Sequence, residues 1–105
     1  IKIYGEFIDG KYITINEMNE IENLYVEDPI TTNIITNKLN MFSKKADYKQ
    51  KDNLIELFEN VKIIRDSENI SGDYAKIDTY NESYKVYSNE NKKVKILIEK
   101  ENLDE

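Results

Sequence analysis

Residues 52–66 read DNLIELFENVKIIRD and carry the strongest secondary-structure signal of the chain. Asp52 is a good helix cap because its carboxylate can accept from the free amides of a first turn. Four apolar residues then recur at the spacing that places side chains on one face of a helix: Leu54, Leu57, Phe58 and Val61. The sequence therefore predicts a helix over residues 52–61. Residues 61–66 form a short apolar run that predicts a buried strand.

Two further helices are predicted upstream of this stretch. In residues 16–25, Asn16 can cap, and Met18, Ile21 and Tyr25 fall on one face. This apolar stripe is thin, so a loop is the alternative. Residues 28–42 begin with Asp28-Pro29, a cap followed by the residue best suited to the first helical position. Their Thr and Ile content also fits a strand, but a helix is favoured.

The first fifteen residues, IKIYGEFIDGKYITI, predict a β-hairpin. Asp9-Gly10 is the dipeptide that most favours a two-residue hairpin turn, since such a turn needs positive φ at both central positions. Closure there would place Ile8 opposite Lys11.

The remainder of the chain predicts a loop, a turn and an antiparallel meander. Residues 43–51 are polar and predict a loop, and residues 67–73 predict a turn. Strands are expected near residues 74–80, 84–88 and 93–99, with connectors short enough for hairpins.

Together these elements predict an α+β fold. An N-terminal hairpin would be followed by two or three short helices that pack on one face of a sheet completed by the C-terminal meander. We expect one domain over residues 1–100 and a frayed acidic tail at 101–105. The expected core residues are Ile13, Ile35, Leu39, Leu54, Phe58, Ile63, Ile77, Val86, Val94 and Ile96.

Residues 73–87, DYAKIDTYNESYKVY, hold half of the eight tyrosines. A hairpin closed around Asn81-Glu82 would pair Ile77 with Val86, Asp78 with Lys85 and Lys76 with Tyr87. Tyr84 would then face the core. The residues that would point outward and bind a protein partner are Tyr74, Lys76, Tyr80, Lys85 and Tyr87. A plain exposed sheet is the favoured alternative, because tyrosine suits strands for its propensity alone.

Charge is unevenly distributed along a chain whose net charge is −6. Residues 38–51 hold five lysines and one acid, and they form a candidate patch for an anionic partner: Lys38, Lys44, Lys45, Lys49 and Lys51. A solvated loop is the favoured alternative. Nucleic acid is a less favoured partner, because the acidic balance repels it and the chain has a single arginine.

Signals for catalysis are weak. Cysteine and histidine are absent, which excludes thiol chemistry and the usual general base, and the three glycines are too scattered for a phosphate loop. The acid pairs Glu17/Glu20 and Glu56/Glu59 lie at helical spacing, but solvated helix faces are the favoured interpretation. Residues 66–73 fit a calcium loop poorly, because Ile70 occupies a ligand position. We expect no enzyme activity, no cofactor and no metal.

Three classes of function are compatible with these patterns. The favoured class is a non-catalytic protein-binding domain, such as an inhibitor or immunity-like factor. The abundance of Ile, Asn, Lys and Tyr indicates an AT-rich genome, as in many bacteria and phages. The alternatives are the soluble domain of an exported or lipid-anchored protein, and an enzyme that uses carboxylates alone. No apolar run is long enough to span a membrane, and the compartment, cytoplasmic or extracytoplasmic, stays open.

Overall fold

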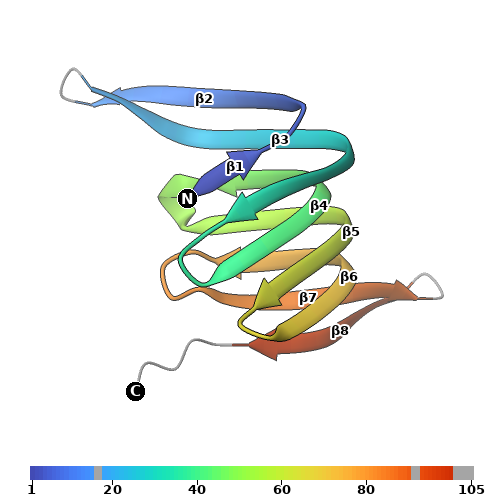
Figure 1. The fold of residues 1–105 in the computed structure, drawn as a ribbon. Helices are drawn as coiled ribbons and strands as arrows, with labels where there is room; N and C mark the ends of the chain where they lie inside the picture. Colours follow the sequence, from blue (N-terminus) through green and yellow to red (C-terminus); the bar gives the residue numbers. More distant parts are fainter. Residues whose placement is uncertain (16–17, 91–92, 101–105) are drawn as a thin grey trace.

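A computed structural model describes residues 1–15, 18–90 and 93–100, and this part of the chain is almost entirely β-strand (Figure 1). It contains no α-helix; one short 3-10 turn, η1, spans Gln50–Asp52. The eight strands are β1 (Lys2–Tyr4), β2 (Phe7–Ile15), β3 (Met18–Ile35), β4 (Leu39–Lys49), β5 (Leu54–Arg65), β6 (Glu68–Asp78), β7 (Ser83–Glu90) and β8 (Lys93–Lys100).

The strands form one antiparallel meander in the order β1-β3-β4-β5-β6-β7-β8. β2 joins this sheet by pairing with the first part of β3, while β1 pairs with its last residues. β1 and β2 therefore act together as one edge of the sheet, interrupted at Gly5 and Glu6.

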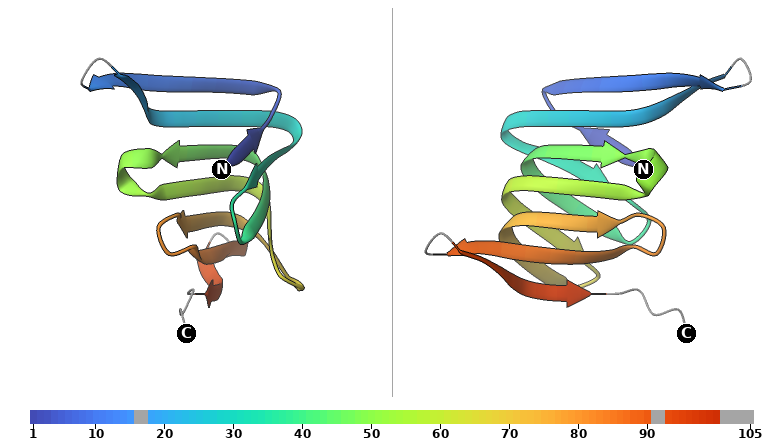
Figure 2. Two further views of the ribbon diagram at one scale, coloured as in Figure 1. Left: turned by 60° about the vertical axis from the view of Figure 1, so that its left-hand side comes forward. Right: turned by 180° about the vertical axis from the view of Figure 1, so that it is seen from behind.

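The sheet is bent across its middle. Pairing is interrupted between Glu27 and Thr32, between Phe42 and Lys45, and between Phe58 and Val61. These bends lie together on one side of the molecule, at the right in Figure 1 and at the left in the rear view of Figure 2. Bulges of this kind bend a strand and increase its twist, so each long strand contributes to two layers.

Layer 1 comprises β2, residues 18–27, 45–49, 54–58 and 74–78, β7 and β8; layer 2 comprises β1 and residues 32–35, 39–43, 61–65 and 68–72.

The core lies between the two layers. One row of directly paired, buried residues crosses layer 1: Val26, Ala46, Leu57, Ala75 and Val86. A second row crosses layer 2: Ile3, Ile34, Met41, Ile63 and Ile70, of which Ile3 and Ile70 are partly buried. Aligned apolar rows of this kind are what cross-strand pairing stabilises.

Polar side chains satisfy the backbone where the bends break the pairing. Thr32 Oγ1 donates to the Ser43 carbonyl at 2.8 Å, and Ser43 Oγ donates to the Lys45 carbonyl at 2.8 Å. Both side chains are buried. Because unpaired buried carbonyls are costly, these two hydroxyls explain how the core tolerates polar residues at this position.

On the side of the molecule away from the bends, Glu82 joins the two layers. Its carboxylate accepts from the Thr36 hydroxyl and from the Lys38 amide, the latter at 3.1 Å. Its backbone carbonyl accepts from Arg65 Nη1 at 3.1 Å. The β6–β7 turn of layer 1 is thereby fixed to the β3–β4 turn and to β5 in layer 2.

The predicted α+β class is wrong. The predicted helix at 52–61 is the first part of β5, and the predicted helix at 28–42 spans the end of β3, a turn and the start of β4. The predicted helix at 16–25 lies in β3 from Met18 onward; Asn16 and Glu17 are outside the described residues.

The predicted turn at Asp9-Gly10 is also wrong. Asp9 pairs with Tyr25 and Gly10 with Leu24 inside β2, and no described glycine has positive φ. That turn type is therefore excluded. The loop predicted at 43–51 is strand up to Lys49, and the turn predicted at 67–73 is strand from Glu68. The strand at 61–66 and the three C-terminal strands are confirmed, with shifted ends.

The predicted core is partly right. Leu39, Ile63, Ile77 and Val86 are buried. Ile35, Leu54 and Phe58 are only partly buried, because they lie on strand positions that alternate with the buried ones. The burial of Ile13, Val94 and Ile96 lies outside what the structure describes.

Candidate functional site

A row of three aromatic rings crosses the solvent-facing side of layer 1. Phe58, Tyr74 and Tyr87 are directly paired on β5, β6 and β7. The ring centroids of Phe58 and Tyr74 are 5.3 Å apart, and those of Tyr74 and Tyr87 are 5.6 Å apart. These spacings lie within the range of favourable aromatic pairs. The three half-buried rings, called here the aromatic row, form one continuous apolar strip.

Tyr74 is held in place by its hydroxyl, which donates to the carboxylate of Glu56. Glu56 is in turn 3.6 Å from Lys49 Nζ. Burial raises the pKa of Tyr74, and the hydrogen bond to Glu56 raises it further. The ring is thus fixed before any partner arrives, so little side-chain entropy remains to be lost on binding.

Two predicted site lysines lie beside the aromatic row. Lys76 and Lys85 are directly opposite one another on β6 and β7, and both are exposed. The predicted pairing of Lys76 with Tyr87, and of Asp78 with Lys85, is wrong by two residues: Tyr74 faces Tyr87, and Asp78 faces Ser83. Because side chains alternate with a period of two, this shift leaves the predicted inner and outer faces unchanged.

The two-residue shift has a local cause. Asp78 Oδ1 accepts from the amides of Tyr80 and Asn81 at 2.8 and 3.4 Å. Aspartate commonly starts turns through such bonds. The turn therefore begins earlier than predicted, and Tyr80 lies in it with 85% of its surface exposed, away from the aromatic row.

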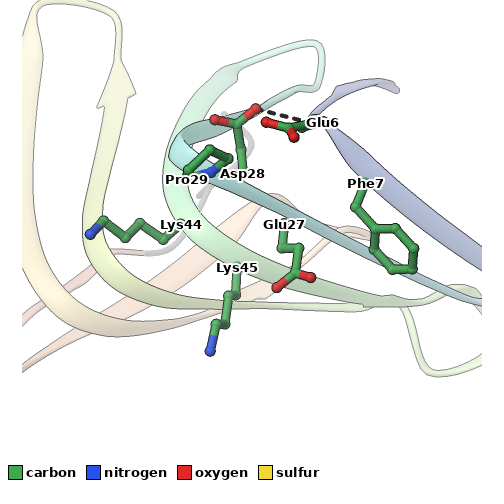
Figure 3. A pocket seen from close by; sticks show the side chains of 7 residues that line it. All are labelled: Glu6, Phe7, Glu27, Asp28, Pro29, Lys44 and Lys45. Atoms are coloured by element: carbon green, nitrogen blue, oxygen red, sulfur yellow. Dashed lines mark hydrogen bonds between the residues drawn. The ribbon is translucent and has the colours of Figure 1, made fainter.

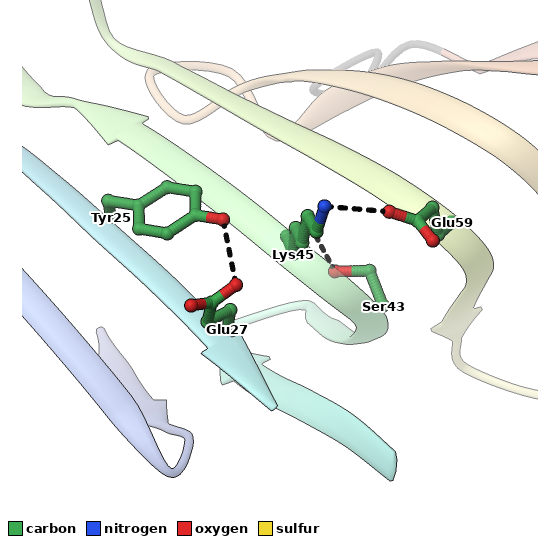
Figure 4. Close-up of polar contacts among 5 residues, drawn as sticks. All are labelled: Tyr25, Glu27, Ser43, Lys45 and Glu59. Atoms are coloured by element: carbon green, nitrogen blue, oxygen red, sulfur yellow. Dashed lines mark hydrogen bonds and ion pairs between the residues drawn. The ribbon is translucent and has the colours of Figure 1, made fainter. Parts of the chain in front are cut away.

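The five lysines of the predicted anionic-partner patch do not converge. Lys38 lies in the β3–β4 turn, Lys44 and Lys45 lie at a bend, and Lys51 lies in η1. Lys49 is on the outer face of layer 1 beside Glu56. Lys45 forms an ion pair with Glu59 (Figure 4), and its Nζ is 3.2 Å from the carboxylate. The patch is thus spread over several sides and is partly neutralised.

A cleft of about 420 Å³ at the bend was not predicted (Figure 3). Its lining mixes acids, lysines and two apolar residues: Glu6, Phe7, Glu27, Asp28, Pro29, Lys44 and Lys45. The carboxylate of Asp28 already makes hydrogen bonds within the fold. It accepts from the backbone amides of Ile30, Thr31 and Glu6 at 2.9, 3.1 and 3.0 Å. These hydrogen bonds lower the pKa of Asp28, and the one from the Ile30 amide has the largest effect. This carboxylate therefore anchors the bend.

The acid pair Glu56/Glu59 lies in β5, whereas Glu17 of the pair Glu17/Glu20 is outside the described residues. Glu56 lies on the outer face of layer 1, whereas Glu59 lies at the bend, so the predicted shared face is wrong. Each is near a lysine, Lys49 and Lys45 respectively. The structure instead places Asp47 directly opposite Glu56, a like-charge pair of a kind that destabilises a sheet. Sequence reasoning missed this pair because it assigned Asp47 to a loop.

Comparison with models of protein families, with curated proteins and with solved structures finds no match to this chain. No described segment forms a helix long and apolar enough to cross a bilayer.

The Tyr74 hydroxyl gives a test by alkaline pH. Its raised pKa means that Tyr74 ionises more readily in the unfolded chain, near pH 10. Its contribution to stability is present below that pH and is lost as pH rises further. We expect Tyr74→Phe to be less stable than the wild type at neutral pH. The wild type should then lose stability relative to this variant above about pH 10.

The measurement is the urea midpoint of both proteins across the alkaline range. Tyr80→Phe is the matched control, because that ring is exposed in a turn, and its midpoints should follow those of the wild type. Parallel curves for Tyr74→Phe and the wild type would contradict the assignment.

Proposed function

We propose that the chain is a non-catalytic protein-binding domain whose partner docks on the outer face of layer 1, over the aromatic row and the two lysines beside it. The observation that carries the proposal is the continuous strip formed by Phe58, Tyr74 and Tyr87. Tyrosine is enriched at binding hot spots because a rigid ring gives contact area at low entropy cost.

The charges around the strip favour a protein partner with both signs of charge. One row of charged residues runs beside the strip, acidic at one end and basic at the other, because its members are directly opposite one another in turn on β4, β5, β6 and β7: Asp47, Glu56, Lys76 and Lys85. Such a row would orient a complementary protein. A nucleic acid would instead meet the carboxylates as well as the lysines, which weakens a stacking platform for single strands. An inhibitor or immunity-like factor would use such a surface.

The location of the binding surface can be tested by photo-cross-linking in a lysate of the source cell. A photoreactive benzoylphenylalanine would replace Tyr87, and in a control protein it would replace Lys62, which is exposed on layer 2. We expect a discrete protein adduct from position 87 and none from position 62. Adducts from both positions, or from neither, would oppose the proposal.

The captured partner then permits a quantitative test. Tyr74→Ala combined with Tyr87→Ala should weaken its binding by at least about tenfold, which is about 1.4 kcal/mol. Lys76→Glu should also weaken binding, and Lys62→Glu is the matched charge control. Circular dichroism would verify that each variant is folded. Unchanged affinity of the folded double-alanine variant would leave these rings as strand residues only.

A further inference from the structure

Exposed large apolar residues are concentrated at the edge formed by β1 and β2. Six large apolar residues are exposed in the described part of the chain, and four of them lie within residues 1–8: Ile1, Tyr4, Phe7 and Ile8. Phe7 and Ile8 are 50% and 46% exposed although they belong to a regular strand. Apolar residues concentrated on one edge are typical of an interaction site.

β2 is open for backbone pairing. It pairs with β3, and among the described strands it has no neighbour on its other side, where Figure 1 shows it as the outermost strand. It is nine residues long, which is longer than an average strand. Such an edge presents a row of unpaired amides and carbonyls that can accept another strand.

The two edges of the sheet differ in their charges. β8, at the opposite edge, reads KVKILIEK, with Lys93, Lys95 and Lys100 and one glutamate in eight residues. Lysine-rich edges discourage pairing. β2 reads FIDGKYITI, with one acid, Asp9, and one base, Lys11, on either side of Gly10.

We propose that two copies of this chain associate through β2, antiparallel and two-fold symmetric, with Gly10 opposite Gly10. Asp9 of each copy is then opposite Lys11 of the other, Ile8 is opposite Tyr12, and Phe7 is opposite Ile13. Opposite charges and apolar pairs stabilise directly opposed positions. Symmetric pairs of identical surfaces are the commonest oligomers.

The register follows from charge. Only alternate residues of β2 direct their backbone groups toward the open side. Two antiparallel copies of β2 can therefore form hydrogen bonds only when one residue is opposite its own copy. The possible registers differ in which residue occupies this central position. A centre at Asp9 would place Asp9 opposite Asp9. A centre at Lys11 would place Lys11 opposite Lys11. Centring on Gly10 is the register among these three that pairs acid with base.

Charge exchange gives a test that is specific to this register. We expect the wild type to be a dimer at tens of micromolar concentration in sedimentation equilibrium. Asp9→Lys and Lys11→Asp, each alone, place like charges opposite and should weaken the dimer at least about tenfold. An equimolar mixture of these two variants should restore a dimer that contains one copy of each, because every opposed pair is again an acid and a base.

Two further variants complete the test. The double variant Asp9→Lys with Lys11→Asp should dimerise like the wild type. Lys62→Asp, on layer 2, changes the net charge as Lys11→Asp does and should leave the dimer unchanged. A wild type that stays monomeric, a dimer insensitive to the single variants, or a mixture that does not associate would overturn the proposal. Open-ended polymers, expected if β2 paired with β8, would also overturn it.

Discussion

Replacing Ile55 by alanine is expected to lower the free energy of unfolding by about 2–5 kcal/mol, whereas Leu54→Ala should lower it by about 1 kcal/mol. Ile55 is fully buried between the layers, where it is paired with Tyr48 and Ile77. Leu54 is on the outer face of layer 1 and is partly exposed. Truncation of a buried side chain leaves a cavity that its neighbours cannot fill, and truncation at the surface does not.

The two adjacent residues discriminate between the folds. In a helix over 52–61 with Leu54 on its apolar stripe, Ile55 would face away from the core and the order of the two effects would reverse. Urea denaturation of both variants is the measurement, with an unchanged slope showing that the shift reflects stability. Equal losses, or a larger loss for Leu54→Ala, would contradict the bent strand.

β5 resembles a helix in sequence because apolar residues of both its faces together give a helical spacing. Leu57 and Val61 are buried, whereas Leu54 and Phe58 are on the outer face and only partly buried. Residues four apart share a face in a strand as they do in a helix, so this spacing does not distinguish the two structures. The bend itself is formed by Glu59-Asn60, with φ of 67° and 53°. Positive φ at two adjacent residues other than glycine is uncommon, so the sequence alone did not suggest a bend.

Asp28 shows how a correct local signal can predict the wrong element. Its side chain accepts from the amides two and three residues ahead, Ile30 and Thr31. A helix cap makes the same hydrogen bonds. The sequence thus identified the chemistry of Asp28 but could not show whether a helix or a bend of β3 would follow.

The candidate site was predictable where strand alternation was regular. The faces of residues 74–78 and 84–87 are as predicted, including buried Tyr84 and outward Tyr74 and Tyr87. Phe58 was missed as a member of the aromatic row because the predicted helix placed it in the core. The cleft at the bend was missed because it joins Glu6, Asp28 and Lys44, whose proximity depends on the bend itself.

Gly72→Ala is expected to lower the free energy of unfolding by about 1–3 kcal/mol or more. Gly72 on β6 lies against Val86 and Tyr87 of β7. An added Cβ would lie 2.5 Å from Val86 Cγ1 and 2.7 Å from the Tyr87 carbonyl oxygen. The φ of Gly72 is not positive, so the requirement for glycine there is close approach rather than backbone conformation. Ser71→Ala, at the exposed neighbouring position, is the matched control and should change stability little.

A second glycine makes this explanation testable in more detail. At Gly5, an added Cβ would lie 2.3 Å from Val26 Cγ2, and the next atom, the Glu27 carbonyl oxygen, is 3.3 Å away. The obstruction at Gly5 is therefore one side chain, whereas at Gly72 it includes backbone, which no side-chain truncation removes. These contacts can be compared in double-mutant cycles. In a Val26→Ala background, Gly5→Ala should cause little further loss in the free energy of unfolding. In a Val86→Ala background, Gly72→Ala should still cause most of its loss. Urea midpoints that show full relief by Val86→Ala would mean that the Tyr87 carbonyl is not the limiting contact.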